Sequence, residues 1–198
     1  MDNVKSILIT GVGGQGTLLA ARILGDAAIR SGYEAKVSEV HGMSQRGGSV
    51  VTYVRYGKSV VSSLICEGGA DVILSFEVLE AARCLPYLKK GGVVVTSTQQ
   101  INPMPVISGA AKYPSDLIGQ MKAADVRVIS ADALSIARAA GSIKASNVAL
   151  IGLGADLFGF SHDVLYESIM SCVPEKAKAV NEAAFKGGLA AASQKHNM

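Results

Sequence analysis

The stretch "ILITGVGGQGTLLAARIL", from Ile7 to Leu24, joins an apolar run, a glycine loop and the start of an alanine-rich helix. The loop itself, "GVGGQG" at Gly11 to Gly16, has the G-x-G-x-x-G spacing, which alone is a weak signal. Glycine allows positive φ angles and a close backbone approach, and the first turn of the following helix presents amide groups to an anion. The stretch therefore predicts the first strand, loop and helix of an α/β domain without specifying a ligand.

The segments around this loop predict a mixed, mostly parallel sheet. The first unit comprises two expected strands, Val4–Thr10 and Glu34–Val40, and the helix Thr17–Arg30 between them. Ser49–Tyr56 then alternates like a strand, and Gly57-Lys58 separates it from the β-prone Ser59–Ile65. A Gly-X pair suits a type II′ turn, so these two segments are expected to form an antiparallel hairpin. The predicted fold class is a three-layer, Rossmann-like α/β domain that includes this hairpin.

Strands and helices alternate again in the second half, which ends in helices. The expected strands are Asp71–Ser75, Val93–Thr96 and Val126–Ser130. The expected helices are Glu77–Leu88, Asp116–Ala123, Ala131–Ala140, Asn147–Phe158, Asp163–Cys172 and Glu175–Ala192. Because prolines interrupt Ile101–Tyr113, a loop with at most a short edge strand is expected there. No internal repeat or linker is visible, so residues 1–198 are expected to form a single domain.

Composition excludes several classes of function. The net charge of +3 and the absence of tryptophan argue against a nucleic-acid partner or an anionic membrane surface. The chain has no signal segment and no apolar stretch of the roughly 18 residues that a membrane helix needs, so a cytoplasmic location is expected. The three cysteines, Cys66, Cys84 and Cys172, are widely spaced, which predicts no metal site and no iron–sulfur cluster on this chain. No catalytic His/Asp/Ser constellation is visible either.

A second loop follows the second expected strand. It reads "EVHGMSQRGGSV" from Glu39 to Val50, and it is too polar and too rich in glycine for an adenosine slot, although Glu39 is in a suitable place to bind a ribose. Both loops lie at carboxyl ends of strands, the usual ligand edge of an α/β sheet. Each loop contributes five candidate residues for cofactor binding or subunit docking: Gly11, Gly13, Gly14, Gln15 and Gly16 from the first, and His41, Ser44, Gln45, Arg46 and Gly47 from the second. Alternatively, the polar side chains tie the loops together. Both interpretations predict that the loops touch.

Taken together, the two loops resemble those of a known family. "GVGGQG" with "EVHGMSQRGGSV" is similar to the gamma-type subunits of 2-oxoacid:ferredoxin oxidoreductases, and most of all to the beta subunits of indolepyruvate ferredoxin oxidoreductases. The likeness extends over nearly the whole chain, including "VISGAAKYP" from Val106 to Pro114 and "NEAAFKGG" from Asn181 to Gly188.

The resemblance implies a reaction in which an arylpyruvate, coenzyme A and oxidised ferredoxin give an arylacetyl-CoA, carbon dioxide and reduced ferredoxin. It also implies that thiamine diphosphate and iron–sulfur clusters do this chemistry. Because this chain lacks the cysteine spacing and the G-D-G run that such groups require, they are expected on a large catalytic (alpha) partner subunit, and this chain is expected to be inactive alone.

Two other functions remain open from the sequence. One is an autonomous NAD-dependent reductase that uses the Gly11 to Gly16 loop, and the other is a non-enzymatic protein that binds a nucleotide or coenzyme A. Within the resemblance, the two loops could contact coenzyme A or only the partner subunit.

Overall fold

The computed structural model describes residues 4–40 and 48–196. In this part of the chain, six strands form one sheet in the order β2-β3-β1-β4-β5-β6. The strands are β1 (Lys5–Val12), β2 (Glu34–Val40), β3 (Ser49–Gly57), β4 (Ala70–Ser75), β5 (Leu88–Ser97) and β6 (Arg127–Ala131). The pairs β1–β4, β4–β5 and β5–β6 are parallel, whereas β3 is antiparallel to both β1 and β2. The expected mixed, mostly parallel α/β fold is confirmed.

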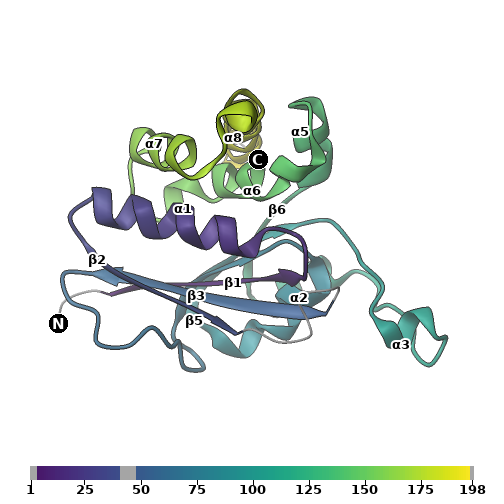
Figure 1. Ribbon diagram of the computed structural model, residues 1–198. Helices are drawn as coiled ribbons and strands as arrows, with labels where there is room; N and C mark the ends of the chain where they lie inside the picture. The colour runs from purple at the N-terminus through teal and green to yellow at the C-terminus, as the bar shows by residue number, and fades with distance from the viewer. Residues whose placement is uncertain (1–3, 41–47, 197–198) are drawn as a thin grey trace.

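Helices cover both faces of the sheet (Figure 1). The α-helices are α1 (Thr17–Arg30), α2 (Val78–Arg83), α3 (Met104–Ile107), α4 (Leu117–Ala123), α5 (Ala133–Ala139), α6 (Ser146–Leu153), α7 (His162–Cys172) and α8 (Lys178–His196). The helices α1 and α5 to α8 form the layer above the sheet in this view, whereas α2 packs against the other face and α3 stands away from the body. No helix in the described residues combines the length and apolarity needed to cross a membrane.

Each face of the sheet has its own buried core, because successive side chains of a strand point to opposite faces. Ile7 and Ile9 of β1 belong to the larger core, with α1, α6 and α8. Leu8, between them, belongs to the smaller core, with Ala81 of α2 and Met121 of α4. Burial on both faces explains why the first strand is a continuous apolar run rather than an alternating one.

The predicted hairpin is only half right. β3 is the antiparallel strand, but residues 59–65 form no strand. Both edges of β3 are already occupied, one by β1 and the other by β2, so no position beside it remains for a further strand. The side chain of Arg55 instead satisfies two carbonyl groups of this segment, with Nη1 donating to Ser62 O at 2.8 Å and to Leu64 O at 3.1 Å. The antiparallel hairpin of this fold is therefore β2–β3.

Two predicted helices are shorter than expected, and one appears inside a predicted loop. The helix expected over residues 77–88 ends at Arg83, because Pro86 follows in a 3₁₀ turn, Leu85–Tyr87, and β5 begins at Leu88. The helix expected over residues 147–158 ends at Leu153, followed by Gly154. The single turn α3 lies in the proline-rich segment that was expected to be loop.

Helices α6 and α8 cross with their backbones in close contact. A Cβ atom added at Gly188 would lie 2.1 Å from the carbonyl oxygen of Ala149, and one added at Gly152 would lie 2.4 Å from that of Phe185. Such separations are far below van der Waals contact, so only glycine fits at these two positions. Gly188 of "NEAAFKGG" therefore has a packing role, because it lets α8 lie directly against α6.

Candidate functional site

The candidate site lies at the carboxyl edge of the parallel strands. The glycine loop leaves β1 there and leads into α1, and β3 begins there at Ser49, opposite Val12. In Figure 1 this edge is the right-hand side of the sheet, where the arrowhead of β1 and the start of α1 meet. β2 also ends at this edge, where Val40 pairs with Val51 of β3. Open α/β sheets bind ligands at such an edge.

Within the glycine loop, the side chain of Gln15 forms hydrogen bonds to other groups of the protein. Its Oε1 atom accepts a hydrogen bond from the amide of Val12 at 2.7 Å. Its Nε2 atom donates to the carbonyl of Phe76 at 3.1 Å and to Oε1 of Gln99 at 3.0 Å. Gln15 therefore joins the ends of β1, β4 and β5. Of the two interpretations of this side chain, the contacts favour the structural one.

Gly16 and Gly11 are required by the close approach of side chains. Gly16 is the residue before α1 and has φ 86°, in the left-handed region, and a Cβ atom there would lie 2.6 Å from Nδ2 of Asn147. That nitrogen donates to the Gly16 carbonyl at 3.3 Å, linking α6 to the loop. A Cβ atom at Gly11 would lie 2.7 Å from Oε1 of Gln15. Gly14 also has positive φ, at 98°, but a Cβ atom there would meet nothing within 4 Å.

The second loop meets the first where the structure describes it. The amide of Gly13 donates to the carbonyl of Gly48 at 2.9 Å, and Oγ1 of Thr10 donates to the carbonyl of Val50 at 3.1 Å. The expectation that the loops touch is therefore met at the end of the second loop. The candidate residues His41, Ser44, Gln45, Arg46 and Gly47 lie outside the described residues.

The strand order argues against a dinucleotide site of the Rossmann type. In that fold the second strand lies next to the first, which brings its terminal acidic residue beside the glycine loop. Here β3 lies between β1 and β2, and Glu39 pairs with Thr52 of β3. Neighbouring strands are about 4.8 Å apart, so Glu39 lies on a strand roughly 10 Å from β1. Glu39 therefore does not lie beside the glycine loop, where the ribose-binding residue of a Rossmann site would be.

A hollow of about 250 Å³ adjoins the glycine loop, and no pattern in the sequence predicted it. Val12, Gly48 and Ser49 form one side, and residues 101–105 form another. Glu80 also lines this hollow, and its side chain is 4% exposed. It accepts a hydrogen bond from the Ser49 hydroxyl and pairs with Nη1 of Arg83 at 2.8 Å. The guanidinium group of Arg83 is half exposed, so it is a cation available at this edge.

Glu77 is a second buried carboxylate, and it organises the same region. Its side chain caps α2 by accepting from the amide of Glu80 at 2.8 Å. Its other oxygen, Oε1, accepts from the amide of Ile101 at 3.1 Å and from the hydroxyl of Tyr113. Burial, and then this bond to Glu77, raise the pKa of Tyr113. In the sequence, the one sign of Glu77 and Glu80 was their spacing, since two glutamates three residues apart follow an expected strand.

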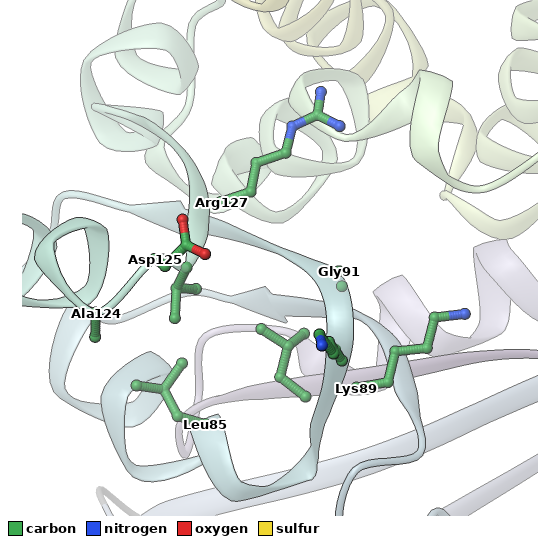
Figure 2. A pocket seen from close by; sticks show the side chains of 10 residues that line it. Leu85, Lys89, Gly91, Ala124, Asp125 and Arg127 are labelled. Atoms are coloured by element: carbon green, nitrogen blue, oxygen red, sulfur yellow. The ribbon is translucent and has the colours of Figure 1, made fainter.

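A larger hollow, of about 570 Å³, lies at the opposite edge, beside the start of β5 and β6. Its floor includes Leu85 and Leu88, and Lys89, Lys90 and Arg127 surround it. In Figure 2 the charged ends of Lys89 and Arg127 lie apart from each other. Lys89 also pairs with Asp71. Lys89 and Arg127 therefore do not converge on one position that an anion could occupy.

The described residues contain no cluster of histidine, cysteine and acidic side chains that could hold a metal ion. Cys66 is exposed, Cys84 is buried and Cys172 is half-buried, and none of them forms a disulfide. Burial raises the pKa of the Cys84 thiol, which keeps it protonated at neutral pH. The three cysteines therefore provide no ligand set.

Comparison with known proteins identifies close relatives. The chain is 47% identical over 194 residues to the indolepyruvate oxidoreductase subunit IorB of Thermococcus kodakarensis, and the match covers 96% of each chain. It is 46% identical over 198 residues to the protein of the same name from Pyrococcus horikoshii, covering 98% of each. Both matches run through the two loops and the C-terminal helices.

Solved structures share the fold. The gamma subunit of a keto/oxoacid ferredoxin oxidoreductase from Geobacter sulfurreducens superposes with a TM-score of 0.72 at 23% identity, covering 96% of this chain and 99% of that one. A 2-oxoglutarate:ferredoxin oxidoreductase from Magnetococcus marinus also gives 0.72, at 20% identity, but the match covers 98% of this chain and only 32% of that one. The profile of the family described as pyruvate ferredoxin/flavodoxin oxidoreductase matches residues 6–191. This chain therefore belongs to the pyruvate ferredoxin/flavodoxin oxidoreductase family.

Proposed function

We propose that this chain is the small, cofactor-free subunit of an indolepyruvate ferredoxin oxidoreductase. The complex would oxidatively decarboxylate indolepyruvate or another arylpyruvate in the presence of coenzyme A. The products would be an arylacetyl-CoA and carbon dioxide, and the two electrons released would reduce ferredoxin. The observation that carries the proposal is the near full-length identity of 46–47% to subunits that bear this name.

The distribution of chemistry between the subunits follows from what this chain offers. Thiamine diphosphate and iron–sulfur clusters supply the carbanion and electron-transfer chemistry, and we place both on a large catalytic subunit. The described residues offer no metal cluster, and Glu39 is separated from the glycine loop by β3, which disfavours an independent NAD-dependent reductase. On this proposal the chain alone is colourless and inactive, and the complex is cytoplasmic.

The two loops are proposed to form one docking rim at the carboxyl edge, facing the thiamine site of the partner. Gly13 and Gly48 already join them through a backbone hydrogen bond, and the N-terminus of α1 adds its positive dipole end. Arg46 would contribute a planar guanidinium group that can grip a phosphate of coenzyme A or a carboxylate of the partner. The contacts of Gln15 support a role for that side chain in holding the rim in shape.

Arg46→Ala tests the rim. The substitution would remove a charge-assisted hydrogen bond that is worth about 1.5–3 kcal/mol. We expect the complex to show a higher KM for coenzyme A or weaker assembly, with an unchanged melting temperature of the lone chain. A sharply lowered melting temperature together with unchanged coenzyme A kinetics would instead assign Arg46 a purely structural role.

Purification from native cells tests the function itself. A tag on this chain is expected to bring down a large, brown, iron-containing subunit, and the eluate is expected to reduce ferredoxin with indolepyruvate and coenzyme A. Calorimetry of the lone chain with NAD serves as the control. Tight NAD binding without a large partner would favour the reductase instead.

A further inference from the structure

An arm projects from the carboxyl edge of the sheet. We define it as residues 102–112, which include α3 and extend away from the body in Figure 1. Met104 and Ile107 are 71% and 65% exposed, although both are large and apolar. Backbone hydrogen bonds within the arm join Ile107 N to Pro103 O at 3.0 Å and Ala111 N to Pro105 O at 2.9 Å. The arm thus has a defined conformation without burying its apolar side chains.

The base of the arm is closed by a single buried oxygen atom. Oε1 of Glu77 accepts from the amide of Ile101, just before the arm, and from the hydroxyl of Tyr113, just after it. Glu77 itself is 1% exposed, and its second oxygen is held by the cap of α2. Because the ends of the arm are fixed together, part of the conformational entropy of ordering it is lost on folding rather than on binding. The arm is preorganised for contact with another surface.

We propose that this arm is the main anchor of the chain on the catalytic subunit, where Met104 and Ile107 insert into an apolar recess. The inference rests on the function proposed above. The arm contains one basic residue, Lys112, and no acidic residue, so the recess it fits is apolar with a neutral or acidic border. Methionine is among the residues enriched at protein–protein interfaces.

The position of the arm indicates that the catalytic subunit is its binding partner. Residues 102–105 line the same hollow as Val12 and Gly48, which belong to the two loops of the docking rim. Leu18, at the start of α1, is also 41% exposed at this edge. A subunit that covers the rim therefore reaches the arm across one continuous surface.

The test is a pair of variants of this chain, each compared with the wild type for association with the catalytic subunit. Met104→Ser combined with Ile107→Ser is expected to weaken association with the cognate catalytic subunit by at least about tenfold, measured by biolayer interferometry on purified subunits. The matched control is Ile29→Ser, because Ile29 is also 65% exposed but lies near the end of α1, away from the arm. The control is expected to bind like the wild type. Thermal melting of both variants is expected to match the wild type, because none of these side chains is buried.

A third variant tests the closure of the base. Tyr113→Phe removes only the hydroxyl bonded to Glu77 and leaves the exposed apolar side chains in place. It is expected to give a smaller loss of affinity, mainly through slower association.

Each outcome decides between distinct conclusions. If the wild type binds and the double variant binds equally well, or if Ile29→Ser is equally damaging, the arm proposal is wrong while the proposed function stands. If the wild type does not bind a catalytic subunit, both proposals fail. If the wild type alone forms a dimer that the double variant cannot form, the arm binds a second copy of this chain and the proposal is overturned.

Discussion

Replacing Gln15 by alanine tests whether the glycine loop is held in shape by its own side chain. The substitution removes the hydrogen bond to the Val12 amide and the two bonds donated to Phe76 and Gln99. A neutral hydrogen bond contributes about 0.5–1.5 kcal/mol, and an unsatisfied buried group costs about 1–3 kcal/mol. Since water can replace part of these bonds at a half-buried site, we expect the free energy of unfolding to fall by about 2–3 kcal/mol.

Urea unfolding of the full chain measures this loss. Gln99→Ala is the matched control, because it removes only one of the three bonds and should cost about 0.5–1.5 kcal/mol. Coenzyme A kinetics of the complex should be measured on the same variants. A Gln15→Ala chain that unfolds within about 0.5 kcal/mol of the wild type, yet loses affinity for coenzyme A, would refute the structural assignment and make Gln15 a ligand group.

Two further predictions concern the packing. Gly188→Ala should lower the free energy of unfolding by at least about 2 kcal/mol, because its Cβ would collide with the backbone of α6. Gly187→Ala should cost less than Gly188→Ala, because its Cβ would meet a side-chain methyl group, Cγ2 of Ile136 at 2.7 Å, rather than backbone, and alanine favours the helix. Equal losses in urea unfolding would contradict the close crossing. The hydroxyl of Tyr56 donates a hydrogen bond to the Phe158 carbonyl at 2.5 Å, and burial raises the pKa of this hydroxyl. The stability that the protonated hydroxyl contributes is therefore present below about pH 10 and is lost as the pH rises further. Tyr56→Phe should make the loss of stability between about pH 10 and 11 less steep by up to about 1.4 kcal/mol per pH unit, and identical slopes would contradict this.

Much of the fold follows from local sequence patterns. The apolar run at Ile7 to Ile9, the glycines and the first helix were predicted because burial, positive φ and helix periodicity leave direct marks on adjacent residues. No such local pattern identified the strands that pair with β3. A suitable turn at Gly57-Lys58 suggested a local hairpin, but the pairing is decided by β1, about 45 residues away, and by β2. Tertiary pairing thus overrode this local signal, and Gly57 lies within β3 rather than in a turn.

The candidate site was predictable only in outline. The two loops were expected to meet, and Gly13 and Gly48 do. The contacts that fix the glycine loop join residues far apart in the sequence, such as Gly16 with Asn147. Glu77 was assigned to a helix, and neither its cap nor its bond to Tyr113 was visible, because the meaning of a buried carboxylate depends on the groups that surround it.

The insertion of β3 between β1 and β2 has a consequence for how this family can diversify. Residues 41–48 join two neighbouring, antiparallel strands whose last pairs, Val40 with Val51 and Glu39 with Thr52, are set by the sheet. Both attachment points are therefore independent of what lies between them. Doubling the length of such a connection costs only about 0.6 kcal/mol in closure entropy. The segment could therefore change in sequence and length, and so accommodate a new substrate or a new partner, while β2 and β3 keep their pairing.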